Sequence, residues 1–176
     1  MANRAALREL QTRLATRLQA ARTEGVLVSW LAVRAGDRNY LFPLVQSGEI
    51  FPLGALQRVP YCNTWFAGVL NLRGGLFGVV DLAAFIANGQ VPTRSEHALS
   101  EASVVTLHTA LEVNCALLVD GLAGLRNTDA FEQASGPEPG APVYFGNRYI
   151  EAGGGVWQEI NLQVLSQQTQ FLSISA

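Results

Sequence analysis

The chain has 176 residues, 49% of them hydrophobic and 15% charged, which fits one domain or two small subdomains and argues against disorder. The formal net charge is −2, so nothing in the charge balance favours a nucleic acid as partner. All twelve basic residues are arginines, and the lack of lysine excludes a P-loop lysine, a Schiff-base lysine and a Ser–Lys dyad.

Residues 1–24 are predicted to form an amphipathic N-terminal helix, which Gly25 would end. Residues 2–22 contain no Pro or Gly, and an apolar stripe repeats at helical spacing at Leu7, Leu10, Leu14 and Leu18. Five arginines make this segment basic, while the remainder of the chain is acidic. Three interpretations stay open: a helix that docks on its own domain, a helix that binds a partner or dimerises, and an organelle presequence. Docking is favoured, and the presequence ranks last.

Residues 25–176 are predicted to form the domain itself. Its first half predicts short strands separated by Gly and Pro turns. Two hairpins are expected, the second of them joined at Arg73-Gly74-Gly75. In chain order the predicted elements are a hairpin of Trp30–Arg34 and Tyr40–Leu44, a short strand Gln46–Phe51, a hairpin of Phe66–Leu72 and Leu76–Leu82, and a short helix over Ala83–Asn88.

The second half repeats the strand pattern after a polar connection between the halves, Gln90–Glu101. A hairpin is predicted from Ser103–Leu107 and Cys115–Asp120, and Gly121–Arg126 continues it. A surface loop, Gly136–Pro142, precedes a second hairpin of Tyr144–Gly146 and Arg148–Ala152, which turns at Gly146-Asn147. The last predicted elements are a strand, Val156–Leu162, and a closing helix, Asn161–Phe171. Asp81 and Asn161 each follow a strand where they could cap a helix. Many short strands with such turns predict barrels or a sandwich.

Arg73 is expected to lie between two buried strands. An unpaired guanidinium in an apolar setting costs several kcal/mol, so an acidic residue of this chain or a partner protein must hold it.

No catalytic constellation accompanies this arginine. His97 and His108 have no nucleophile pattern beside them, and Asp81 and Asp120 are better explained as caps. The two cysteines, Cys62 and Cys115, match no zinc spacing; one disulfide between them is conceivable, but free thiols of the core are favoured. We therefore expect no enzymatic activity, no metal and no cofactor. Because no secretory signal and no apolar run of bilayer length occurs, a cytoplasmic protein without membrane insertion is expected.

The central motif resembles that of CheW-like domains, the adaptor domains of bacterial chemosensory arrays. The resemblance is carried by Pro60, Phe66, Gly68-Val69, Asn71-Leu72-Arg73-Gly74 and Val79-Val80-Asp81-Leu82, with Glu49-Ile50 upstream and Leu117-Leu118-Val119-Asp120 downstream. It implies a mainly β fold of two five-stranded SH3-like barrels around a shared core. It also implies a non-enzymatic role in which the domain binds the cytoplasmic tip of a chemoreceptor and the regulatory domain of a histidine kinase. The N-terminal helix and the sequence of Gly78–Phe85 look most like those of adaptors of twitching-motility (type IV pilus) systems.

The resemblance also implies a partner-binding site, for which the candidates are Ser47, Glu49, Ile50, Gly68, Leu72 and Arg73. Arg73 and Glu49 match the family's motif arginine and its acidic partner, so a Glu49–Arg73 salt bridge is predicted. Ser47 and Gly78 depart from the family pattern, as does Asn161, which replaces an Asp. The alternative function is a small β-barrel that binds a ligand, or a hydrolase with a cryptic site, which would need a deep pocket lined by His97 or His108.

Overall fold

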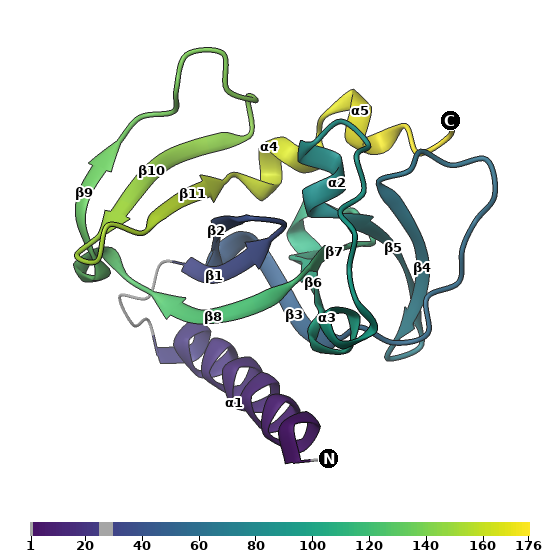
Figure 1. Cartoon of the computed structure of the whole chain (residues 1–176), viewed down its shortest axis with the longest axis horizontal. Coiled ribbons are helices and arrows are strands. Elements are labelled where there is room, and N and C mark those ends of the chain that lie inside the picture. The colour runs from purple at the N-terminus through teal and green to yellow at the C-terminus, as the bar shows by residue number, and fades with distance from the viewer. Residues whose placement is uncertain (1, 25–29) are drawn as a thin grey trace.

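The computed structural model describes residues 2–24 and 30–176, with the side chains of residues 8–19 in the first range. Within this described part, eleven strands form a six-stranded and a five-stranded sheet, arranged side by side (Figure 1). The strands are β1 (Trp30–Ala35), β2 (Arg38–Pro43), β3 (Ser47–Pro52), β4 (Phe66–Leu72), β5 (Gly75–Asp81), β6 (Ser103–Leu107), β7 (Cys115–Val119), β8 (Gly121–Arg126), β9 (Phe131–Ser135), β10 (Phe145–Glu151) and β11 (Val156–Ile160).

The two sheets are interleaved along the chain. The five-stranded sheet, ordered β3-β6-β7-β5-β4, is one continuous stretch of sequence. The six-stranded sheet, ordered β8-β1-β2-β11-β10-β9, takes strands from both sides of that stretch, and β2 pairs in parallel with β11. The predicted mainly β fold of two subdomains is therefore confirmed, but the sheets have six and five strands and neither is a closed barrel.

The main core lies between the sheets and joins them into one body. Its fully buried members come from both sheets and from the short helices, including Leu31, Phe42, Phe85, Leu117 and Ile160. Burial of this apolar surface is the dominant stabilising contribution, at about 25 cal/mol per Å². A smaller aromatic cluster fills the other face of the six-stranded sheet, where the rings of Trp30 and Tyr149 lie 4.8 Å apart.

Two short helices begin in the same way, as the sequence predicts. The helix α2 (Leu82–Ile86) is capped by Asp81, which accepts a hydrogen bond from the Ala84 amide at 3.2 Å. The helix α4 (Leu162–Ser166) is capped by Asn161, which accepts from the Val164 amide at 3.0 Å. Asn161 thus performs the capping that an Asp would perform.

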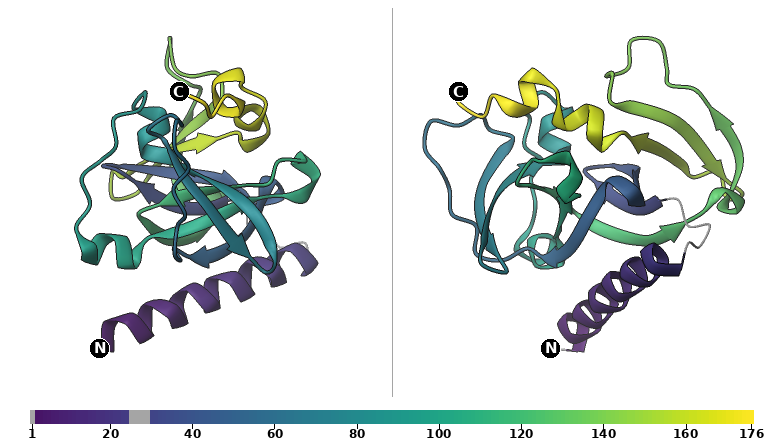
Figure 2. Two further views of the ribbon diagram at one scale, coloured as in Figure 1. Left: turned by 90° about the vertical axis from the view of Figure 1, so that its right-hand side faces the viewer. Right: turned by 180° about the vertical axis from the view of Figure 1, so that it is seen from behind.

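The N-terminal helix α1 (Ala2–Glu24) docks on the domain, as the favoured interpretation predicts. It contacts β3 and β8 and lies on the opposite side of the molecule from α2 and α4 (Figure 2). Leu14 and Leu18 are buried, and Gln11 donates a hydrogen bond of 2.7 Å to the hydroxyl of Ser103. Leu10 is half exposed, so the buried stripe is narrower than predicted; Leu7 and Gly25 lie outside the described residues and side chains.

In the second half, two predictions were wrong and one strand was missed. Phe145–Glu151 form the single strand β10, because Gly146-Asn147 is an irregularity in its pairing with β11 and not a turn. The exposed edge strand β9 was not predicted, since its sequence FEQAS is mostly polar. The closing helix is broken into α4 and α5 (Thr169–Leu172), with Gln168 extended between them.

The connections also differ from prediction. Residues 90–101 do not join the two halves, because they contain α3 (Glu96–Glu101) and lead back into the five-stranded sheet at β6. The strand β8 does not extend the β6–β7 hairpin; it pairs with β1 in the other sheet. The chain enters the five-stranded sheet between β2 and β3, and it returns to the six-stranded sheet at Asp120, between β7 and β8.

Candidate functional site

Arg73 occupies a tight turn at the tip of the β4–β5 hairpin. Leu72 pairs with Gly75, and the two residues between them, Arg73 and Gly74, both have positive φ, 50° and 81°. Two positive φ values are typical of the two-residue turns that match the twist of a hairpin. The Asn71 side chain accepts a hydrogen bond of 3.0 Å from the Gly74 amide and so stabilises the turn.

The environment of Arg73 corrects the prediction of a buried guanidinium. Its side chain is 73% exposed, because the turn projects it beyond the ends of the two strands. The predicted salt bridge is nevertheless confirmed: Arg73 Nη1 lies 2.9 Å from Glu49 Oε2. The guanidinium carbon also lies 5.6 Å from the centre of the Phe51 ring, within reach of a cation–π interaction.

The Glu49–Arg73 pair joins the two edges of the five-stranded sheet. Glu49 lies on β3 and Arg73 follows β4, and these are the outermost strands of the sheet. Their side chains therefore bridge the two edges of the sheet at this rim, although β3 and β4 do not pair with each other. Exposed ion pairs contribute at most about 1 kcal/mol to stability, so the pair matters more for the shape of the rim than for folding.

A cavity of about 410 Å³ opens beside this pair. Its wall combines charged, polar and apolar groups from both edges of the sheet and from the β6–β7 connection: Gly48, Glu49, Phe51, Leu72, Arg73, Gly75, Phe77, Thr106, Leu107, His108, Thr109, Val113 and Asn114. The pair and this cavity, together called the rim site below, place a recess of mixed polarity beside two opposite charges.

The other predicted site residues divide between the rim site and the interior. Leu72 lines the rim site and is half-buried, whereas Ile50 packs in the main core. Ser47 is fully buried, and its hydroxyl donates to the Pro43 carbonyl at 2.9 Å. Gly68 is also buried, with φ 140°, and a Cβ there would lie 2.9 Å from the Gln57 carbonyl carbon. The close approach at Gly68 is therefore made by the chain itself.

A buried arginine does exist, at a position that the sequence analysis missed. Arg94 is 8% exposed, and its Nη1 lies 2.6 Å from Asp81 Oδ2 while its Nε donates to Asp120. Burial lowers the pKa of Arg94, but the two carboxylates outweigh burial and raise it above its ordinary value. Asp120 does not cap the segment that follows it; its Oδ2 accepts a 2.6 Å hydrogen bond from the Gly36 amide.

The signal for this cluster was present in the sequence. Asp81 and Asp120 each lie at the end of an apolar strand. The strands β5 and β7 are parallel neighbours, so both carboxylates lie at the same end of these two strands. Two acidic groups at one buried edge require a cation.

Both cysteines and both histidines lie in the described residues, and each has a defined environment. Burial raises the pKa of the Cys115 thiol to about 12, which keeps it protonated, and both cysteines are free. Cys62 is only half-buried, so it is not the core residue predicted. The histidines are hydrogen-bonded or exposed: His108 Nδ1 accepts from the Ala110 amide, and His97 lies 3.4 Å from Glu101 on α3. In the described part of the chain, no three or more His, Cys, Asp or Glu side chains gather so that they could hold a metal ion.

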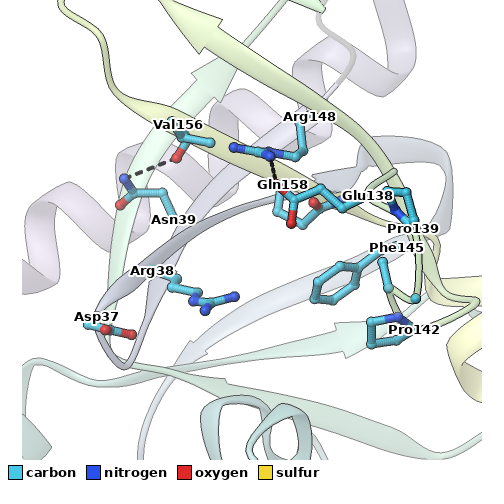
Figure 3. Close-up of a pocket in the computed structure, with 12 residues that line it drawn as sticks. Asp37, Arg38, Asn39, Glu138, Pro139, Pro142, Phe145, Arg148, Val156 and Gln158 are labelled. Carbon is cyan, nitrogen blue, oxygen red and sulfur yellow. Dashed lines mark hydrogen bonds and ion pairs between the residues drawn. The ribbon is translucent and has the colours of Figure 1, made fainter. Parts of the chain in front are cut away.

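A second cavity, of about 600 Å³, lies between the β1–β2 turn and the loop before β10 (Figure 3). Arg148 pairs there with Glu138, and Asn39 donates to the Val156 carbonyl at 3.4 Å. The residues that line it include no histidine, cysteine, serine or lysine. This cavity therefore offers charged and apolar surface, with the carboxylates of Asp37 and Glu138 in its wall.

Comparisons with known proteins agree with the geometry. Protein PilI of Pseudomonas aeruginosa (strain PAO1) is 28% identical over 167 residues, which cover 93% of this chain and 89% of that protein. The crystal structure of scaffolding protein TtCheW from Thermoanaerobacter tengcongensis superposes with a TM-score of 0.63 at 14% identity, covers 81% of this chain and 94% of that one, and so shares the fold. No described helix has the length and hydropathy that a membrane crossing requires. Residues 29–169 match the model of the CheW-like domain, and the chain belongs to that family.

Proposed function

We propose that this chain is a non-enzymatic adaptor that couples chemoreceptors to a histidine kinase in a bacterial chemosensory array. Membership of the CheW-like family and the shared fold with a scaffolding protein support this function. The similarity to Protein PilI supports the twitching-motility branch that the sequence analysis favoured. An adaptor of this kind works in the cytoplasm, at arrays that the receptors attach to the membrane.

The observation that carries the proposal is the rim site. Two opposite charges are held 2.9 Å apart on the surface beside a recess with apolar and polar walls. His108 also lines this recess, and its Nδ1 is occupied by a hydrogen bond from the Ala110 amide. Protein interfaces commonly combine an apolar centre with a few fixed polar anchors, and arginine is enriched among the residues that dominate binding.

The proposed roles differ among the predicted site residues. Glu49, Arg73 and Leu72 contact the partner, because they line the rim site. Ser47 and Ile50 support the strand that carries Glu49, because both are buried on β3, whereas Gly68 is buried against Gln57 and serves the packing of β4. The proposed partners are the regulatory domain of the kinase and the cytoplasmic tip of the receptor.

A binding experiment with Arg73→Ala tests this proposal. The purified chain is titrated with the kinase regulatory domain and, separately, with a receptor tip fragment. Loss of a dominant interface arginine costs about 2 kcal/mol or more, which is a weakening of at least about 30-fold for one of the two partners. Arg58→Ala is the matched control, because Arg58 is exposed and lies outside the rim site. Equal binding of wild type and Arg73→Ala to both partners would remove the rim site from the interface.

A further inference from the structure

The pairing of β3 with β6 is irregular at Glu49. Ser47 pairs with Leu107 and Ile50 pairs with Val105, so three residue steps on β3 oppose two on β6. The extra residue is a β-bulge at Gly48–Glu49. Bulges re-aim side chains and increase the local twist.

The bulge changes which side chains face the core. In a regular strand the side chains alternate, so Ser47 and Ile50 would point to opposite faces. Here both are buried, at 0% and 7% exposure, while Glu49 and Phe51 remain partly exposed. Glu49 and Phe51 are the two residues of β3 that contact Arg73.

Thr106 on β6 satisfies the backbone that the bulge leaves unpaired. Its Oγ1 accepts a hydrogen bond of 2.7 Å from the Glu49 amide, and its hydroxyl lies 3.3 Å from the Glu49 carbonyl, to which it donates. Thr106 is 6% exposed, so without these bonds its hydroxyl would be buried without the partners that the Glu49 backbone provides.

Gly48 makes the arrangement possible by its small size. A Cβ at Gly48 would lie 2.7 Å from the Thr106 carbonyl oxygen and 2.8 Å from that of Leu107, closer than real Cβ contacts allow. Gly48 does not have a positive φ, so glycine is needed here for the close approach of the two backbones and not for its backbone conformation. Any other residue at 48 would push β3 away from β6.

We propose that the Gly48 bulge and the Thr106 hydroxyl form a positioning device that places the Glu49 carboxylate against Arg73 and so sets the shape of the rim site for its protein partner. This inference rests on the proposed function. Thr106 acts through Glu49: it holds the amide and carbonyl of the residue whose side chain pairs with Arg73.

The test compares Thr106→Val, which keeps the shape and removes the hydroxyl, with Thr106→Ser, which keeps the hydroxyl. Affinity for the kinase regulatory domain and for the receptor tip fragment is measured by calorimetry. The comparison uses the partner whose binding Arg73→Ala weakens. For that partner we expect Thr106→Val to weaken binding about 5- to 10-fold, as for the loss of one well-placed hydrogen bond, while the affinity of Thr106→Ser stays within about 2-fold of wild type. Gly48→Ala should weaken binding by a different route, and it replaces Thr106→Val if that variant does not fold.

A double-mutant cycle separates positioning from general destabilisation. In a Glu49→Gln background, Thr106→Val should add less than about 2-fold, because the carboxylate that it positions is already gone. A full additional loss in that background would overturn the inference. Unchanged binding of Thr106→Val and Gly48→Ala, while Glu49→Gln and Arg73→Ala lose binding, would overturn it too and leave the proposed function intact.

Amide hydrogen exchange at Glu49 provides a readout without any partner. Faster exchange in Thr106→Val than in Thr106→Ser is expected if the hydroxyl holds this amide. Equal exchange in the two variants would overturn the inference. If instead Arg73→Ala binds both partners as wild type does, the proposed site fails, and the exchange measurement still decides whether Thr106 fixes the bulge.

Discussion

At the scale of single residues, the exposed pair and the buried cluster show two uses of arginine. Arg73 is 73% exposed and held by one carboxylate, whereas Arg94 is 8% exposed and held by two. A buried guanidinium without a partner would cost several kcal/mol, while an exposed one costs little. Arg94 therefore serves the fold, and Arg73 is available for binding.

The buried thiol of Cys115 gives a prediction about alkaline pH. Its pKa is about 12 in the folded protein, against 9.0 as its ordinary value. Between these pH values the unfolded chain releases a proton that the folded chain keeps, so stability falls as pH rises, by about 1.4 kcal/mol per pH unit at the steepest. Below pH 9 this contribution is fully present.

Urea unfolding at a series of pH values from 7 to 11 measures this effect. The variant Cys115→Ala serves as the comparison, because it has no thiol to titrate. We expect the stability difference between the two proteins to narrow or reverse as pH rises above 9. Parallel curves over the whole range would contradict the pKa assigned to Cys115.

At the scale of elements, α1 is part of the cooperative structure. Leu18 is 3% exposed and belongs to the main core, whereas Leu10 on the same helix is 50% exposed. Docking of the helix covers parts of β3 and β8, which are edge strands of their sheets. Covered edges are protected from pairing with other chains.

The two leucines supply a matched test of docking. Leu18→Ala removes buried surface and should destabilise the protein by about 2–4 kcal/mol, while Leu10→Ala should cost less than about 0.5 kcal/mol. Equilibrium urea denaturation measures both changes. Equal, small effects would show that α1 does not dock in solution.

Local turn chemistry explains which elements the sequence predicted well. The strand β4 was predicted with its observed bounds, and the β1–β2 hairpin to within one or two residues, because each is apolar and ends at a turn marked by Gly. By contrast, Gly146-Asn147 has the composition of a turn but forms a bulge, where the Asn147 amide donates to Glu159 Oε2 at 3.3 Å. That contact is 12 residues away along the chain, so no local pattern reveals it.

The site shows the same division between local and distant information. The Glu49–Arg73 pair was predicted from the resemblance, but the exposure of Arg73 was not, because strand hydropathy says little about a side chain in the turn. Arg94 was missed, since its partners lie 13 and 26 residues away along the chain. The bulge at Gly48 became visible only with the register of β3 against β6.

At the scale of the whole molecule, Arg94 links the two sheets. Asp81 ends β5 in one sheet, and Asp120 leads into β8 in the other and accepts from Gly36 in the β1–β2 turn. The cluster therefore joins three segments that meet between the subdomains.

Arg94→Ala should accordingly destabilise the protein by about 3–5 kcal/mol, because it leaves two carboxylates at a buried edge without their cation. Arg58→Ala is the control and should change stability by no more than about 0.5 kcal/mol. The measurement is urea denaturation followed by tryptophan fluorescence. A loss as small as that of the control would show that solvent reaches the cluster.

The central claim is that this chain joins two partners. The most direct measurement is size-exclusion chromatography with light scattering on a mixture of the chain, the kinase regulatory domain and a receptor tip fragment. We predict a complex whose mass requires all three components, formed by wild type and by Arg58→Ala and reduced with Arg73→Ala. Complexes of the kinase domain and the receptor tip that form equally well without the chain, or no binding of either partner to it, would contradict the adaptor function.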